Sequence, residues 1–426
     1  MTANYMYQKT ILKNGLGLIT VPMEGTKAVT VLVLFGTGSK YETREQNGLS
    51  HFLEHMFFKG TTKRPNTLAI AETLDRIGGQ YNAFTSKEMT GYWAKAARPH
   101  LDLVLDWVSD ILLNSKFDIK EIDRERGVIT EEINMYQDMP SEYVGILWDQ
   151  LLYGDQPAGW PVIGTKENIQ NFNHEKFLSY FRDHYLANNA VVVVAGQLDH
   201  DDIKIKVDNY FGGLNQATAT TKKSVIEKQT QPQCLIHFKK TDQTHFCLGT
   251  RAYNLSHPDK YALSLLAIIL GGNMSSRLFI KVRERLGLAY YVKTGVEMQT
   301  DIGYLVTQAG VDHQKAGKAI SAILAEYQKI AREPISEDEL KKAKDCVSGH
   351  VILEMESSDA QASFHADQEL LENKILTIEE QLGMIDKVTV ADLSRAARDI
   401  FRPEKLNLSL IGPFKEKDKF DKLLKV

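Results

Sequence analysis

The chain has 426 residues, which exceeds what one hydrophobic core usually organises and predicts two domains of about 200 residues each. With 43% hydrophobic and 25% charged residues, a mean hydropathy of -0.28 and no apolar run of 18 residues, the composition indicates a folded protein and excludes a membrane span. The net charge of only -4, with acidic and basic residues interspersed, argues against nucleic acid and membranes as partners.

Cysteine usage and the N-terminal residues bear on the cellular compartment. Cys234, Cys247 and Cys346 are odd in number and form no Cys-x-x-Cys pair, which predicts reduced, buried thiols. The segment from Met1 to Lys9 has neither the apolar core of a secretory signal nor the Arg- and Ser-rich character of an organelle presequence. We therefore expect a cytoplasmic protein, although a chain whose leader had been removed would look the same.

The first half alternates strands with helices. A β-branched apolar run at 29–35 predicts a strand, and the mostly apolar segment 48–58 predicts the buried helix that follows it. The pattern then predicts a strand at 92–96, helices at 100–113 and 119–136, and a valine-rich strand at 190–195.

The second half repeats this order. It has a strand at 245–252, a helix at 258–270 and a closing strand at 406–411. The last strand and the residues before it, 401–412, resemble 185–196 in the first half. This repeat predicts two similar tandem α+β domains that arose by internal duplication.

A polar segment separates the two halves. Residues 216–232 are rich in Thr, Lys and Gln and have almost no apolar periodicity, which is typical of an exposed linker. We therefore predict one domain at 1–215 and a homologous one at 233–426. Where the first domain reads His-Phe-Leu-Glu-His, the corresponding helix of the second reads Ser-Leu-Leu-Ala-Ile-Ile, so only the first can carry the metal site considered next.

The segment His51-Phe-Leu-Glu54-His55 has the spacing of a metal site. Residues four apart on a helix lie one turn apart on one face, so the two imidazoles can share one ion, and Glu54 falls on the same side. This is the H-x-x-E-H pattern of the inverted zincins. The alternative is a pair of histidines that pack or cap a core helix. Three ionisable groups would be costly there without a cation, because the neighbouring residues are apolar: Phe52, Leu53, Met56, Phe57 and Phe58.

A third ligand is expected on the helix at 119–136, where Glu125, Glu131 and Glu132 compete. If the apolar positions of this helix face the core, the rotation of about 100° per residue places Glu132 on the core side and Glu131 on the solvent side. Glu125 lies one heptad before Glu132 on the same face. It is therefore placed to orient a ligand or the bound water.

Two segments carry a family resemblance. Gly48-Leu-Ser-His-Phe-Leu-Glu-His-Met-Phe-Phe-Lys-Gly-Thr61 and Glu125-Arg-Gly-Val-Ile-Thr-Glu-Glu132 resemble blocks of the peptidase family that contains pitrilysin, insulin-degrading enzyme and the mitochondrial processing peptidase. The resemblance covers nearly the whole chain. It implies a zinc (Zn2+) metalloendopeptidase with His51, His55 and Glu132 as ligands and Glu54 as the general base.

The resemblance also assigns a substrate strand. Gly78-Gly-Gln-Tyr-Asn-Ala-Phe-Thr-Ser-Lys-Glu-Met-Thr90 is similar to the family block whose edge strand pairs with the substrate backbone. This implies that Asn82, Ala83 and Phe84 bind substrate, with the first two beside the scissile bond. The alternative is an ordinary hairpin. Because an edge strand offers free N–H and C=O groups, it can accept an extended peptide of almost any sequence.

In the second half, Ser276 to Tyr291 resembles the family segment that holds an arginine and a tyrosine seven residues apart. Arg283 and Tyr290 match these positions, which implies that they donate hydrogen bonds to the substrate carbonyl and its developing oxyanion. Neighbouring side chains leave alternatives open. These are Arg277, Arg285 and Tyr291.

The family fold is two similar α+β domains, each an antiparallel-rich sheet covered by helices, that form a clamshell around the substrate. Four such domains make one chamber, so the resemblance implies a homodimer or a heterodimer with a related subunit.

The leading hypothesis is an endopeptidase that acts on extended or unfolded polypeptides. A noncatalytic scaffold or binding subunit is the rival, and a zinc hydrolase of non-peptide substrates is a third. The scaffold members usually lack metal ligands, which are all present here.

Overall fold

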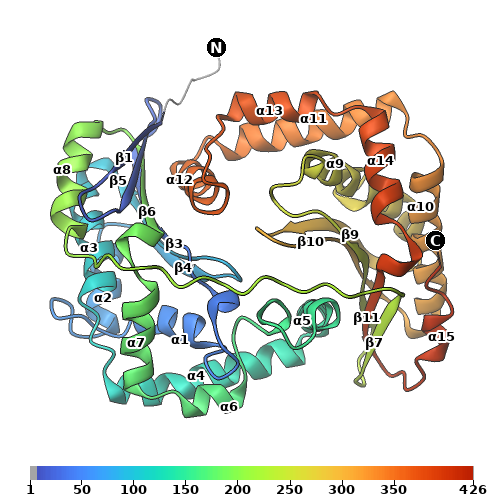
Figure 1. The fold of residues 1–426 in the computed structure, drawn as a ribbon, viewed down its shortest axis with the longest axis horizontal. Helices are drawn as coiled ribbons and strands as arrows, with labels where there is room; N and C mark the ends of the chain where they lie inside the picture. The colour runs from blue at the N-terminus through green and yellow to red at the C-terminus, as the bar shows by residue number, and fades with distance from the viewer. Residues whose placement is uncertain (1–6, 426) are drawn as a thin grey trace. The chain divides into compact units, whose positions relative to one another are not determined.

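The computed structural model describes residues 7–425. The chain divides into two compact units, each built around one β-sheet (Figure 1). Among the described residues, the first unit contains 7–133, 161–223 and 352–377. The second unit contains 134–160, 224–351 and 378–425.

The first unit has a six-stranded sheet in the order β1-β2-β6-β3-β5-β4. Only β2 and β6 are parallel, and the other pairs are antiparallel. The central strands β3 and β6 are buried almost throughout because helices cover both faces of the sheet. The strands are β1 (Gln8–Ile11), β2 (Gly17–Pro22), β3 (Ala28–Phe35), β4 (Gln80–Thr85), β5 (Thr90–Ala97) and β6 (Ala190–Gly196).

The second unit repeats this topology in five strands, ordered β7-β11-β8-β10-β9. Its one parallel pair, β7 with β11, corresponds to β2 with β6. The predicted duplication of an antiparallel-rich α+β domain is therefore confirmed. The strands are β7 (Gln233–Phe238), β8 (Thr244–Arg251), β9 (Ala289–Met298), β10 (Gly303–Val311) and β11 (Leu406–Gly412).

Helices form the other layers of both units. In the first unit they are α1 (Leu49–Met56), α2 (Thr67–Asp75), α3 (Leu101–Leu113), most of α4 (Ile119–Asp138), α6 (Lys166–Asn171), α7 (His174–His184), α8 (His200–Phe211) and α12 (Ser358–Asp367). In the second they are α5 (Pro140–Tyr153), α9 (Lys260–Gly271), the π-helix η5 (Phe279–Arg285), α10 (Ala316–Arg332), most of α11 (Glu337–Glu354), α13 (Ile378–Asp386), α14 (Val390–Ile400) and α15 (Asp418–Asp421). None of the helices formed by residues 7–425 is long and apolar enough to cross a membrane.

Each sheet is covered on one face by a helix from the other half of the sequence. Helix α12 packs on β3 and β6 of the first sheet (Figure 1). The small, fully buried side chains of Ala362 and Ala366 join the apolar cluster of that face. Conversely, α5 packs on β8 and β11 of the second sheet through residues such as Trp148. In this exchange of helices between the two halves of the sequence, each helix buries apolar sheet surface that would otherwise face water.

We predicted two contiguous domains, whereas each unit of the structure contains segments from both halves of the sequence. The change of unit at 223–224 falls inside the predicted linker 216–232, which forms no helix or strand. However, 134–160 and 352–377 belong to the unit opposite to the one expected from their place in the sequence. Linear composition did not indicate this because the residues of a helix do not specify which sheet it covers, and the buried face of α12 combines Ala362 and Ala366 with the polar Gln361 and His365.

Candidate metal centre

Helix α1 presents the H-x-x-E-H residues, and its first turn is held by buried polar contacts. Gly48 precedes the helix with φ 101°, a left-handed conformation that favours glycine, and a Cβ there would lie 2.8 Å from the Ile163 carbonyl oxygen. The Glu42 carboxylate accepts hydrogen bonds from the backbone N–H groups of Gly48 (2.9 Å) and Ser50 (2.7 Å). Because these N–H groups have no partner within the helix, Glu42 stabilises the start of α1.

The structure brings His51, His55 and Glu132 together, with one ligand atom from each lying within 4.8 Å of the others. The two imidazole rings are 4.7 Å apart, one turn apart on α1. Glu132 reaches them from α4, where it is half-buried, whereas the neighbouring Glu131 is exposed. These exposures agree with the orientation expected from helical phase, in which Glu132 faces inward and Glu131 faces solvent.

The distances among these atoms fit a shared metal ion better than hydrogen bonds. Nε2 of His51 lies 3.7 Å from Oε1 of Glu132, and Nε2 of His55 lies 3.6 Å from Oε2, which is too long for a hydrogen bond. Two ligands bound about 2.1 Å from a tetrahedral ion are about 3.4 Å apart. Burial, and then the charge of His55, lower the pKa of His51 to about 3, so His51 carries a free lone pair at neutral pH. A neutral imidazole is the form that binds metals.

Glu125 orients His55 from α4. Its Oε1 accepts a 2.9 Å hydrogen bond from Nδ1 of His55, and its Oε2 accepts one of 2.7 Å from Nζ of Lys59. Burial alone would raise the pKa of Glu125, but these two hydrogen bonds, together with the charges of their donors, outweigh it and hold the pKa below its usual value. The ionised carboxylate fixes the proton on Nδ1 and leaves Nε2 of His55 directed at Glu132. By contrast, Nδ1 of His51 is buried and makes no hydrogen bond within residues 7–425.

Glu54 lies beside the three possible ligands without belonging to the group. Its Oε2 accepts a 2.6 Å hydrogen bond from the hydroxyl of Thr85, the last residue of β4. Burial raises the pKa of Glu54, and this hydrogen bond partly offsets the rise. A carboxyl group with a raised pKa and one fixed oxygen suits proton transfer. The sequence did not single out Thr85 or Lys59, although Lys59 follows His55 by four residues.

A cavity of about 280 Å³ opens beside these groups. It is lined by Glu54, His55, Phe58, Lys59, Tyr81, Asn82 and Ala83. Strand β4, which supplies the last three, is the edge of its sheet and pairs only with β5 among the described residues. The geometry thus combines a possible metal site, a carboxylate and an open strand edge.

Two family models match the chain. The model described as Insulinase (Peptidase family M16) matches residues 19–166, and the one described as Peptidase M16 inactive domain matches residues 171–346. The chain belongs to the M16 peptidase family. The family resemblance drawn from the sequence is therefore confirmed. The inactive-domain match agrees with the loss of the H-x-x-E-H pattern from the second half.

Curated M16 relatives match over almost their whole length. The uncharacterized zinc protease YmxG of Bacillus subtilis is 36% identical over 409 residues, which are 96% of this chain and 98% of that protein. An uncharacterized zinc protease of Rickettsia felis is 34% identical over 414 residues, covering 97% of this chain and 98% of its own.

Two solved structures have the same fold. A protease from Helicobacter pylori superposes with a TM-score of 0.90 at 25% identity and covers 96% of this chain and 100% of that chain. An M16 inactive domain from Pseudomonas fluorescens has a TM-score of 0.89 and covers 96% of this chain and 98% of that chain. Because its identity is only 17%, this similarity supports the fold alone.

The remaining residues expected from M16 resemblance differ in their surroundings. Phe84 of β4 packs against the apolar cluster between the first sheet and α12, so its ring is directed away from the cavity that Asn82 and Ala83 line. Only the backbone of Phe84 is therefore available to pair with a substrate. Alternation along the strand separates Phe84 from Ala83, whereas Asn82 shares the face of Phe84 and reaches the cavity from its exposed position on the edge strand.

Arg283 and Tyr290 lie in the second unit and are accessible. Arg283 has a side chain 39% exposed and lies over the ring of Phe279, and Tyr290, on β9, is 75% exposed. Two of the three alternatives are engaged elsewhere. Arg277 pairs with Glu339 through two nitrogens, and the Tyr291 hydroxyl bonds to His245.

Proposed function

We propose that this M16 protein is a zinc-dependent endopeptidase that cleaves extended or unfolded polypeptides. The observation that carries the proposal is the convergence of His51, His55 and Glu132 next to the half-buried Glu54, along one cavity and one open strand edge. Each of these features has a separate role in peptide hydrolysis.

His51, His55 and Glu132 would hold the zinc ion. The two nitrogens and one carboxylate oxygen are ligand types that catalytic zinc sites use. When bound, zinc polarises a substrate carbonyl and lowers the pKa of a water molecule. Glu125 would act as a positioning residue, because its hydrogen bond with His55 fixes the direction of the ligand nitrogen.

Glu54 would serve as the general base and then as the general acid. Its carboxylate takes a proton from the attacking water while the carbon–oxygen bond to the substrate carbonyl forms. It then delivers this proton to the leaving amine as the peptide bond breaks. The hydrogen bond from Thr85 occupies Oε2, which leaves Oε1 for the proton.

The free edge of β4 would bind the substrate backbone. An extended peptide added beside Asn82 and Ala83 makes main-chain hydrogen bonds whatever its side chains, which favours broad substrate preference. Arg283 and Tyr290 are proposed to hydrogen-bond the substrate carbonyl, with the second domain serving a noncatalytic role. We also propose a cytoplasmic homodimer, or a heterodimer with a related subunit, as the working form.

A peptide-library experiment tests the proposal. The purified chain is incubated with an unbiased peptide library, and products are identified by mass spectrometry before and after removal of metal by a chelator. We expect internal cleavage that stops with the chelator and returns with about one zinc equivalent per chain. If the zinc-loaded chain binds library peptides but leaves them intact, the noncatalytic binding-subunit alternative replaces the endopeptidase.

A further inference from the structure

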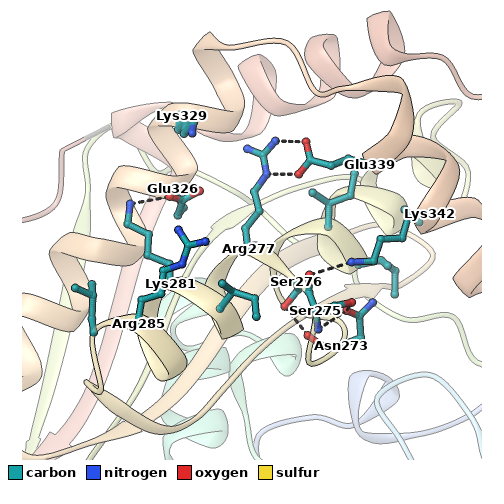
Figure 2. Close-up of a pocket in the computed structure, with 15 residues that line it drawn as sticks. Asn273, Ser275, Ser276, Arg277, Lys281, Arg285, Glu326, Lys329, Glu339 and Lys342 are labelled. Carbon is teal, nitrogen blue, oxygen red and sulfur yellow. Dashed lines mark hydrogen bonds and ion pairs between the residues drawn. The ribbon is translucent and has the colours of Figure 1, made fainter.

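A second cavity, of about 660 Å³, lies within the second unit and shares no residue with the candidate metal centre (Figure 2). Its walls come from the end of α9, the loop that follows it, η5, α10 and α11. The volume is in the range of about 300–1,000 Å³ that is usual for sites of small molecules. The peptidase proposal assigns no role to this cavity.

Positive charge exceeds negative charge in its lining. Arg277 donates to both oxygens of Glu339, at 2.7 Å each, and Nζ of Lys281 lies 2.7 Å from Oε1 of Glu326 (Figure 2). Each pair has no net charge, and together the two pairs include both carboxylates that line the cavity.

Three further cations of the lining have no carboxylate of the cavity as partner. Nζ of Lys342 donates to the neutral backbone carbonyl of Ser275 at 3.0 Å. Lys329 lies 3.8 Å from Glu333, in an exposed pair outside the lining. Arg285 makes no hydrogen bond or ion pair with the described residues that would neutralise it. The lining therefore carries three more positive than negative charges, and Glu333, which does not line the cavity, partly offsets the charge of Lys329.

Local backbone geometry places several of these groups on one wall. Arg277, Lys281 and Arg285 follow one another at intervals of four along one helical segment, so they rise from the same side (Figure 2). Most of this segment is the π-helix η5, a form often found at functional sites. Nη1 of Arg277 is buried and has no hydrogen-bond partner among the residues that the structure describes, and it lies on the side of the guanidinium away from Glu339. A ligand oxygen would satisfy this donor.

The same cavity also offers apolar contacts. Ile268, Ile280 and Leu286 contribute to its lining, and Leu286 is 41% exposed. A purely ionic ligand would leave these side chains in contact with water. The lining therefore suits a molecule with both an anionic and an apolar part.

We propose that this cavity binds a small molecule in which a phosphate group is attached to an apolar, for example aromatic, body. A phosphate carries about two negative charges at neutral pH, which matches the excess charge better than one carboxylate does. Arginine guanidinium groups also match phosphate oxygens in geometry. The proposal is independent of the peptidase function.

Calorimetric titration of the full chain with 1-naphthyl phosphate tests it. Comparison ligands are 1-naphthoate, inorganic phosphate and 1-naphthol, which change or remove one part at a time. We expect 1-naphthyl phosphate to bind at least about tenfold more tightly than each of them, and its affinity to fall with added salt. Equal binding of 1-naphthoate, or no binding of 1-naphthyl phosphate, would overturn the proposal.

Variants locate the binding. Arg285→Gln and Lys329→Gln change exposed side chains, so we expect both variants to fold, and each should weaken binding of 1-naphthyl phosphate about tenfold. Lys318→Gln, at another exposed lysine of α10, is the matched control and should leave affinity unchanged. If all three variants bind like the parent, or if a short glutamate-rich peptide binds more tightly than 1-naphthyl phosphate, the assignment is wrong.

Discussion

The hydroxyl of Thr85 donates a 2.6 Å hydrogen bond to Oε2 of Glu54, joining the end of strand β4 to helix α1. One strand thus both borders the cavity and fixes one oxygen of the proposed base. Thr85→Val keeps the shape of the side chain and removes the donor. We expect kcat to fall about tenfold with little change in KM, and Thr85→Ser to restore most of the rate.

The same variant should change the pH profile of kcat/KM. Glu54 must be ionised to accept a proton, so the rate falls as pH drops through its pKa, which burial raises above the usual value. Because the Thr85 hydrogen bond lowers this pKa, Thr85→Val should move the acidic limb to higher pH. An unmoved limb, with a rate like that of the parent, would contradict the role given to Thr85.

Glu54→Gln tests the base directly. The amide cannot accept the proton from water, so turnover should fall by a factor of about 100 or more. Zinc content and peptide affinity should persist because Glu54 is not among the three grouped ligands. Metal analysis, a binding titration and a cleavage assay on this single variant separate these roles. Cleavage at near the parent rate would remove Glu54 from the mechanism.

The third ligand can be checked by comparing two neighbours. Glu132→Gln removes a carboxylate that faces both histidines, whereas Glu131→Gln changes an exposed side chain one residue away. After dialysis against dilute chelator, elemental analysis should find little zinc in the first variant and about one ion per chain in the second. The assignment of Glu132 fails if only the Glu131 variant loses metal.

Glu125→Gln should weaken zinc binding without abolishing it. The amide loses the charge that fixes the proton on Nδ1 of His55, and loss of such a partner typically costs about 10–100-fold in affinity. Competition with a zinc-binding dye would measure the change. An affinity equal to that of the parent would show that the hydrogen bond from Glu125 does not support the ligand.

Ala362→Arg tests the exchange of helices between the units. Ala362 is fully buried between α12 and the first sheet, so a long charged side chain there should lower the free energy of unfolding by about 3 kcal/mol or more. Ala360→Arg, at a half-buried site on the same helix, is the control. Urea denaturation of both variants gives the comparison. Equal stability would mean that α12 is not needed to cover this sheet.

Local periodicity determined much of this protein from the sequence alone. The four-residue spacing of His51 and His55 and the phase that separates Glu132 from Glu131 follow from the geometry of a single helix, so neighbouring residues suffice to predict them. The strands 29–35 and 190–195 were recognisable for a similar reason. Strands buried on both faces read as continuous apolar runs.

Tertiary structure alone decided which distant segments meet. The hydroxyl groups of Thr30 and Ser358 lie 2.8 Å apart although 328 positions separate them, and this contact accompanies the placement of α12 on the first sheet. Thr85 reaches Glu54 across 31 positions, and the cations of the second cavity gather from η5, α10 and α11. A sequence pattern reports which face of an element is apolar, but not which partner covers it. That choice depends on the packing of the whole chain, because burial of apolar surface is not directional.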